Sequence, residues 1–170
     1  IPGLDLDNIL VMRTPDDAIG LREAVESGTV KRAVIAGGGF IGLEVAENLA
    51  AQGVKVTVID MAPHVLPNFL DSDMAEYIEN KMADAGIMAL TGTALEGVTG
   101  EGKVEKVQTS RRAIKADALI LAIGIRPNTA FLEGTGIEMI KGTVVTDQYM
   151  QTNVADIYAA GDCAMVTNRQ

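Results

Sequence analysis

A glycine-rich turn between a continuous apolar run and a helical pattern constrains the fold of this chain more than any other feature. Val30–Ala36 is apolar except for one basic pair, and the string GGGFIG follows at once. A run with apolar residues on both faces is typical of a central parallel strand that is covered on both sides. Beyond the turn, Ile41, Val45 and Leu49 recur every four residues and predict a helix over Phe40–Gln52 that packs on the sheet.

The next segment completes a strand–helix–strand unit. Gly53 ends the predicted helix, and the β-branched, alternating string VKVTVI predicts a second strand over Val54–Ile59. A helix that crosses between two strands makes them parallel, and the whole segment has the length of about 30 residues that a βαβ unit needs.

The glycine spacing in this unit indicates dinucleotide binding. Gly37 allows the tight turn after the strand, Gly39 has no side chain to block a pyrophosphate, and Gly42 lets the helix approach the strand. The amides at the N-terminus of the helix attract phosphate groups. Asp60, eighteen residues after Gly42, is placed to accept hydrogen bonds from an adenosine ribose. The alternative is a turn with a purely structural role.

Asp60 also bears on the choice of cofactor. Its carboxylate would repel a ribose 2′-phosphate, and the following residues, MAP, supply no Arg or Lys to neutralise one. We therefore expect NADH rather than NADPH. The alternative is that Asp60 only caps a turn.

A strand and a helix precede the unit. The apolar stretch Ile9–Met12 predicts the strand, and Pro15–Ser27 reads as a helix that begins after Thr14 and ends at Gly28.

A second helix and a third strand follow the unit. The helix is expected to begin after Asp71 and to stop at Gly86, and the strand covers Ile87–Leu90. The apolar residues of this helix are expected to share one face that packs in the core: Met74, Tyr77, Ile78, Met82 and Ala85.

The second half of the chain has shorter elements. Leu95–Lys115 consists of short alternating pieces that predict an antiparallel meander, and Ala118–Ile123 predicts a buried strand. The string IYAAGD at residues 157–162 reads as a further apolar strand. The predicted fold class is α/β, a Rossmann-like dinucleotide-binding domain with a parallel sheet and an antiparallel β-meander crossover.

Composition and charge argue against several kinds of partner. A net charge of −9 would repel a nucleic acid backbone, and the longest apolar run, Ala118–Ile125, is far shorter than the roughly 20 residues that cross a bilayer. No leader opens the chain, and its single cysteine, Cys163, cannot form an internal disulfide, so we expect a soluble cytoplasmic protein. Because the sequence opens at Ile1 rather than at Met, we also expect a piece of a longer protein.

Three ordered strings, AGGGFIGLE, AIGIRPNT and TDQYMQTNVADIYAAGDCA, resemble the pyridine nucleotide-disulfide oxidoreductase family. The NADH oxidase, NADH peroxidase and coenzyme A-disulfide reductase branch is the most similar. The resemblance covers nearly all of the chain, from the IPG at residue 1 to the GDCA that ends at residue 164. It implies that residues 1–127 form an NADH-binding domain with a leading strand and helix. Residues 128–170 would then return to an FAD domain that is mostly absent.

The resemblance also implies roles for single residues. Asp162 would hydrogen-bond FAD, and Glu44 would lie near the nicotinamide and flavin rings, although it could equally be an exposed helix carboxylate. Phe40 would gate the nicotinamide pocket or pack on the sheet, and Gly124 would lie close to the dinucleotide or simply end a strand. The complete set of expected cofactor-binding residues is Gly37, Gly38, Gly39, Phe40, Ile41, Gly42, Glu44, Asp60, Gly124 and Asp162.

Catalytic and metal-binding residues are not expected in this chain. The family resemblance places the redox cysteine upstream of the IPG string, so Cys163 is predicted to be a small buried packing residue. His64 has no candidate catalytic partner and is expected to have a surface or packing role.

The resemblance implies hydride transfer from NADH to FAD and onward to oxygen, peroxide or a disulfide such as coenzyme A disulfide. The isolated chain would be inactive, and the full-length protein would be a homodimer with further FAD and dimerisation domains. One alternative is a non-catalytic NAD(H)-sensing module, against which the GDCA string argues. Another places FAD itself on GGGFIG, although such a motif normally opens a chain.

Overall fold

The chain forms two compact units, Ile1–Gly124 and Ile125–Gln170, in a computed structural model. The structure describes residues 1–166, and the last four residues of the predicted segment 128–170 lie outside that part.

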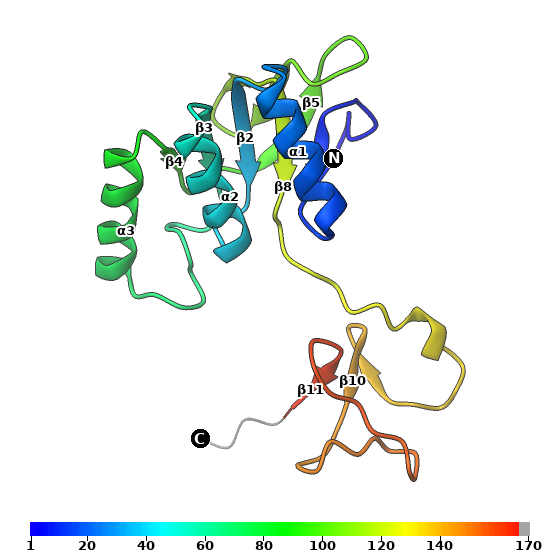
Figure 1. Ribbon diagram of the computed structural model, residues 1–170. Helices are drawn as coiled ribbons and strands as arrows, with labels where there is room; N and C mark the ends of the chain where they lie inside the picture. Colours follow the sequence, from blue (N-terminus) through cyan, green and yellow to red (C-terminus); the bar gives the residue numbers. More distant parts are fainter. Residues whose placement is uncertain (167–170) are drawn as a thin grey trace. The chain divides into compact units, whose positions relative to one another are not determined.

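A five-stranded parallel sheet forms the centre of the first unit (Figure 1). Every pair of neighbouring strands in it is parallel, which confirms the predicted sheet. In spatial order the strands are β1 (Ile9–Val11), β8 (Ala118–Leu121), β2 (Arg32–Ala36), β3 (Lys55–Ile59) and β4 (Met88–Leu90).

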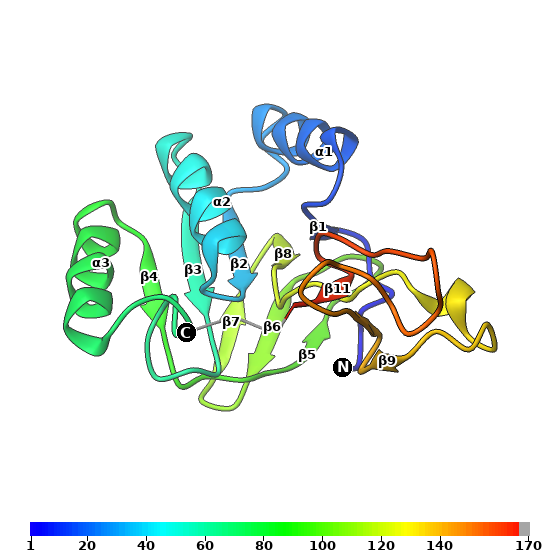
Figure 2. The same cartoon turned by 90° about the horizontal axis from the view of Figure 1, so that it is seen from below.

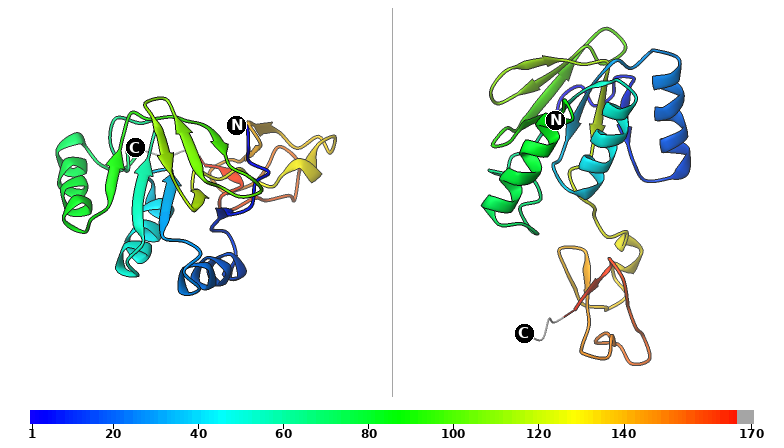
Figure 3. Two further views of the ribbon diagram at one scale, coloured as in Figure 1. Left: turned by 90° about the horizontal axis from the view of Figure 1, so that it is seen from above. Right: turned by 60° about the vertical axis from the view of Figure 1, so that its left-hand side comes forward.

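Helices cover one face of this sheet and an antiparallel meander covers the other (Figures 2 and 3). The helices are α1 (Pro15–Glu26), α2 (Phe40–Ala51) and α3 (Ser72–Asp84). The meander consists of β5 (Leu95–Thr99), β6 (Lys106–Thr109) and β7 (Ala113–Lys115), as the alternating pieces predicted. The α/β class with a meander crossover is therefore confirmed.

The central strand β2 is apolar throughout its buried part because it contacts both layers. Ile35 belongs to the core on the helix side, together with Ala46 and Leu49 of α2. Its neighbour Val34 points the other way, into the core on the meander side with Val107 of β6. Successive side chains of a strand alternate between the two faces, so a strand that is covered twice needs a continuous apolar run.

The predicted core face of α3 is partly wrong. Met74 and Tyr77 are 52% and 56% exposed, and Ala85 is exposed as well. The residues that face the sheet are Ala75, Ile78 and Met82, whose spacing of three and four follows the helical repeat. Met74 and Tyr77 each precede a core-facing residue by one position, which turns them about 100° away from the sheet. The methionines of this helix are therefore only partly core.

Two more apolar residues are exposed where the pattern predicted packing. Ile41 is 45% exposed, because the inner face of α2 is formed by Gly42, Ala46 and Leu49. Ile123 is 64% exposed, since β8 ends two residues earlier, at Leu121.

The second unit has short elements. They are the 3₁₀ turn η1 (Ala130–Leu132) and the strands β9 (Met139–Ile140), β10 (Thr143–Val145) and β11 (Ala164–Met165). Strand β10 pairs with β9 antiparallel and with β11 parallel.

Two predictions for the second unit are wrong. Residues 157–162 do not form a strand, because Ile157 and Tyr158 are 41% and 60% exposed and only one isolated bridge, Gln151 to Tyr158, pairs this backbone. The strand in this region begins later, at Ala164. Cys163 is half-buried rather than buried, and its Sγ donates a hydrogen bond to the Ala160 carbonyl oxygen at 3.4 Å.

Candidate dinucleotide-binding site

The glycine turn lies at the carboxyl end of β2, between that strand and its neighbour β8. From β2 the chain continues to β3 on one side, while β8 and β1 lie on the other, so this is the point where the strand order switches. Open parallel sheets bind ligands at such a point, outside the carboxyl ends of the strands.

Gly37 is required by the turn itself. Its φ of 114° lies in the region that side chains rarely adopt, and a Cβ there would overlap the Ala122 carbonyl oxygen at the end of β8. The Gly37 amide donates a hydrogen bond of 2.8 Å to Ile59, the last residue of β3. The turn is therefore held between both neighbouring strands.

Gly42 and Gly39 leave space for different purposes. A Cβ on Gly42 would overlap the Gly37 carbonyl oxygen and lie 3.4 Å from Cγ2 of Ile35, which confirms that this glycine brings α2 close to β2. Gly39 is the N-cap of α2, and apart from its two chain neighbours a Cβ there would have no atom of the described residues within 4 Å. No side chain caps this helix end. Open space therefore lies beside the unpaired amides of the first helical turn, where an anion can approach.

Asp60 contacts the glycine turn directly. Its Oδ2 accepts a hydrogen bond of 2.6 Å from the Gly38 amide, and its Oδ1 accepts one of 2.8 Å from the Ala62 amide. The side chain thus caps the turn after β3, as one of the two alternatives predicted. Each carboxylate oxygen has a second lone pair, so these bonds leave Asp60 able to accept from a hydroxyl group as well.

The loop after Asp60 is tied to the same turn by contacts that the sequence analysis missed. The Leu66 amide donates to the Gly38 carbonyl oxygen at 2.9 Å, and the Val65 amide donates to Oε1 of Glu79 on α3 at 3.0 Å. Gly38 is therefore bonded on both sides, through its amide to Asp60 and through its carbonyl to Leu66. These bonds fix the carboxylate relative to the turn.

Phe40 opens α2 beside this loop and is 55% exposed, so the alternative that it packs on the sheet is wrong. Its ring instead contacts Phe69, with the ring centroids 4.7 Å apart and the planes inclined by 56°. Phe69 could not be identified from the sequence. It lies in a loop, and no local pattern links it to Phe40, which is 29 positions earlier in a helix. Glu44, one helical turn beyond Phe40, is exposed.

Two further expected cofactor-binding residues, Gly124 and Asp162, lie outside the glycine turn and the loop after Asp60. Gly124 follows β8 with φ of 98° and open space around it, so it lies beyond the strand that borders the glycine turn. Asp162 is exposed and belongs to the second unit. The structure therefore brings together the residues of the turn, Phe40 and Asp60, and it does not place Asp162 with them.

The half-buried His64 has its Nδ1 3.0 Å from the Val65 carbonyl oxygen, in keeping with the surface or packing role expected for it. Among residues 1–166, no group of three His, Cys, Asp or Glu side chains could hold a metal ion. No helix in the same range is both long and apolar enough to cross a membrane.

Comparison with solved structures shows close likeness in fold. The water-forming NADH oxidase from Lactobacillus brevis bound to NADH superposes with a TM-score of 0.89 and 35% identity, over 96% of this chain and 36% of that one. An NAD-dependent persulfide reductase from A. fulgidus gives a TM-score of 0.91 and 33% identity, over 96% of this chain and 30% of that one.

Sequence comparison gives the same result. The chain is 37% identical to an NADH oxidase of Methanocaldococcus jannaschii over 166 residues, which cover 98% of this chain and 37% of the relative. It is 38% identical to the NAD(P)H coenzyme A polysulfide/persulfide reductase of Pyrococcus horikoshii, over 96% of this chain and 37% of the relative. The chain thus spans little more than a third of the length of these relatives. A family model described as pyridine nucleotide-disulphide oxidoreductase matches residues 1–170. With its parallel sheet, glycine turn and meander, the chain belongs to the pyridine nucleotide-disulphide oxidoreductase family.

Proposed function

We propose that this chain binds NADH as part of an FAD-dependent oxidoreductase. The pyrophosphate lies over the glycine turn at the N-terminus of α2, and Asp60 accepts hydrogen bonds from the adenosine ribose. The observation that carries the proposal is the open space at Gly39 next to a carboxylate that is bonded to the adjacent Gly38 amide. A βα turn with only a structural role has no need for both features.

The reaction of the whole protein is hydride transfer from NADH to flavin, and from flavin to oxygen, peroxide or a disulfide such as coenzyme A disulfide. Relatives named NADH oxidase and coenzyme A polysulfide/persulfide reductase support this class. FAD supplies the redox chemistry when it is bound. This chain contributes binding and orientation of the nucleotide, and the exposed Asp162, next to Gly161 at φ of 85°, is available to hold FAD.

The domain arrangement follows from the same proposal. Residues 1–127 form the NADH-binding domain, and residues 128–170 belong to the FAD domain, which the division of the chain after Gly124 supports. We place the whole protein in the cytoplasm as a homodimer. The single cysteine, Cys163, fits that compartment.

Asp60 makes the site selective for NADH. Support comes from an engineered, NADPH-bound variant of the Lactobacillus brevis oxidase, which carries five substitutions. Among them an aspartate is replaced by alanine and the residue after it by arginine. A substituted glycine lies eighteen residues before that aspartate and a substituted proline seven residues after it. Gly42, Asp60 and Pro67 have the same spacing in this chain.

The magnitude of the selectivity can be worked out from the charges. Two like charges about 4 Å apart repel by about 4 kcal/mol at an effective dielectric constant of about 20, and by about 1 kcal/mol in bulk water. Asp60 is half-buried, between these limits, so we expect NADPH to bind about 10- to 100-fold more weakly than NADH.

Calorimetric titration of the chain and its Asp60→Asn variant with both nucleotides tests the proposal. The variant should lose most of the discrimination and bind NADH about fivefold more weakly, because its hydrogen bonds to the ribose are no longer charge-assisted. Asp84→Asn is the matched control, since it removes one exposed carboxylate from the far end of α3. Equal affinity for the two nucleotides in the unmodified chain would refute the role of Asp60, and no NADH binding at all would refute the site.

A further inference from the structure

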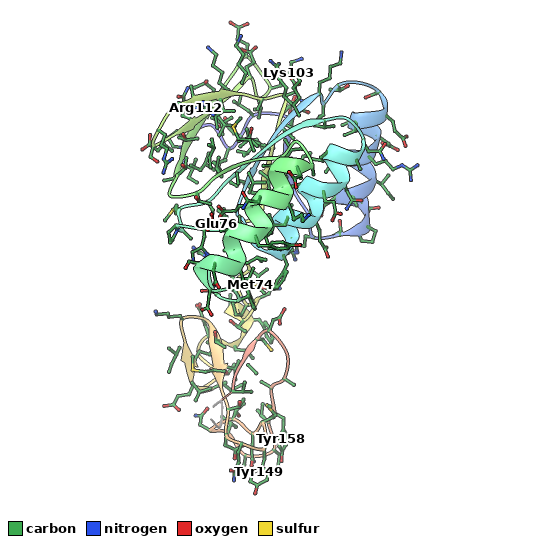
Figure 4. All side chains as sticks on the ribbon, turned by 90° about the vertical axis from the view of Figure 1, so that its left-hand side faces the viewer. Met74, Glu76, Lys103, Arg112, Tyr149 and Tyr158 are labelled. Carbon is green, nitrogen blue, oxygen red and sulfur yellow. The ribbon has the colours of Figure 1, made fainter. Side chains whose placement is uncertain are left out.

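A positively charged groove lies at the amino ends of the sheet strands, the end opposite to the glycine turn. Two cavities of about 350 Å³ and about 600 Å³ adjoin there, and they share Thr29, Arg32 and Asp117 in their walls. Figure 4 shows Lys103 at this end of the first unit and Met74, at the start of α3, at the other. The cationic side chains that line the groove are Lys31, Arg32, Lys55, Lys103, Lys106 and Lys115.

The groove is basic in a chain that is acidic as a whole. Its six cations are matched by two carboxylates, Glu105 and Asp117, so the lining carries a balance of +4 while the chain carries −9. Six of the 14 Lys and Arg residues of the chain thus gather around one end of the sheet. A concave surface of one sign attracts and concentrates ions of the other.

One of the two carboxylates is already committed to the protein. Asp117 Oδ1 lies 2.6 Å from Arg32 Nη2, and its Oδ2 accepts from the backbone amides of Lys31 and Arg32 at 3.1 and 2.9 Å. The guanidinium of Arg32 holds the pKa of Asp117 below its ordinary value. Within residues 1–166 the ion pairs are Arg32–Asp117 and Arg22–Glu26, so the five lysines of the groove have no carboxylate within 4.0 Å.

Two of these lysines stand directly opposite each other. Lys106 and Lys115 are partners in the antiparallel register of β6 and β7, and the next pair, Val107 and Ile114, points into the core on the meander side. Like charges that face each other across a strand pair destabilise it. The groove therefore holds an arrangement that costs folding stability in the free protein and that a bound anion would relieve.

Helix ends explain only some of the cations. Lys31 and Lys55 follow the C-terminal ends of α1 and α2, where positive charge is favourable. Lys103, Lys106 and Lys115 belong to the meander and its loop, and all three line the smaller cavity. Capping of helices does not account for them.

We propose that this groove binds a small polyanion with two or more linked phosphate groups. Three lysines around a cavity of about 350 Å³ can contact neighbouring phosphates together, and charge-assisted hydrogen bonds are the strong ones. The described residues that line the two cavities offer lysine and arginine side chains for the phosphate chain and no aromatic ring on which a base could stack. Inorganic triphosphate and a nucleoside triphosphate should therefore bind with similar affinity.

The test uses inorganic triphosphate and the double variant Lys106→Gln, Lys115→Gln, with Lys81→Gln on α3 as the control. Calorimetry at 0.15 M salt should give one saturable site in the unmodified chain, and the double variant should bind at least about tenfold more weakly. The control variant should bind normally. A second readout is thermal unfolding. Without ligand, the double variant should melt at a higher temperature than the unmodified chain. Triphosphate should raise the melting temperature of the unmodified chain and of the control variant, and should raise that of the double variant by less.

Three results would overturn the proposal. They are the absence of saturable binding, equal affinity in the double variant, and competition between triphosphate and NADH, which would place the anion on the glycine turn instead. ATP that binds much more tightly than triphosphate would contradict recognition through phosphate alone. NADH titration of the double variant keeps this test separate from the proposed function, because Asp60 and the glycine turn are unchanged in it.

Discussion

Replacing Gly42 by Ala tests whether the helix and the strand approach each other as closely as the structure indicates. Glycine in a helix interior is ordinarily less stable than alanine by about 1 kcal/mol, so the exchange should normally stabilise the protein. At Gly42 the new Cβ would overlap the carbonyl oxygen of Gly37, which is backbone and cannot rotate away. We expect this variant to unfold with a free energy about 1 to 3 kcal/mol lower than that of the unmodified chain, the usual range for overpacking.

Gly20→Ala supplies the matched control. Gly20 lies inside α1 and is exposed, and a Cβ there would have no atom of the described residues within 4 Å other than the backbone of its own helix and its two chain neighbours. This exchange should raise the free energy of unfolding by about 1 kcal/mol. Urea denaturation followed by circular dichroism measures both variants. If Gly42→Ala stabilised the protein as much as Gly20→Ala does, the close approach of α2 to β2 would be refuted.

Two further predictions concern Gly39 and Asp117. Gly39→Val should still fold, because Gly39 has ordinary extended backbone that valine can adopt. The variant should bind both NADH and NADPH more weakly by calorimetry, because the valine side chain would occupy the open space in which we place the pyrophosphate. Unchanged affinity for both nucleotides would contradict that use of the space. Asp117→Asn should lower the free energy of unfolding near pH 7 by about 1 to 3 kcal/mol. Because the folded protein lowers the pKa of Asp117, its contribution is complete above the ordinary value of 3.8 and is lost as the pH falls through the lower folded pKa. Denaturation curves of both proteins at several pH values check this. A difference in the free energy of unfolding that persists at the lowest pH would contradict the assignment of this contribution to the ionised Asp117.

The features of the fold that could be predicted are those that local pattern determines. The apolar run of β2, the glycine turn and the alternating strand β3 lie in adjacent residues and determine the strand–helix–strand unit. Helix α1 begins after Thr14 as expected, and the structure adds that Thr14 and Asp17 cap it. The core face of α3 was harder to predict, because Met74 and Tyr77 fit an apolar stripe along a helix as well as Ala75 does. Only packing against the sheet distinguishes them.

Contacts between distant residues could not be predicted from pattern. The Phe40–Phe69 contact and the bond from Val65 to Glu79 depend on how the loop after β3 folds back over the turn. The pairing of Lys106 with Lys115 depends on the register of the meander, which its loops fix. Residues 157–162 form no strand. Their apolar side chains Ile157 and Tyr158 are exposed, so little burial offsets the conformational entropy that an ordered strand would cost.

The central claim is that the glycine turn and the N-terminus of α2 bind the pyrophosphate of NADH. Titration of the isotopically labelled chain with NADH, followed through its backbone amide resonances, tests this most directly. We predict that the amides of Gly38, Gly39 and Phe40 show the largest shifts and that the amides of Asp60 and its neighbours shift less along the same saturation curve, since these groups surround the open space at the turn. Shifts that centre on Lys103 and Lys106 at the opposite end of the sheet, with the turn unaffected, would contradict it.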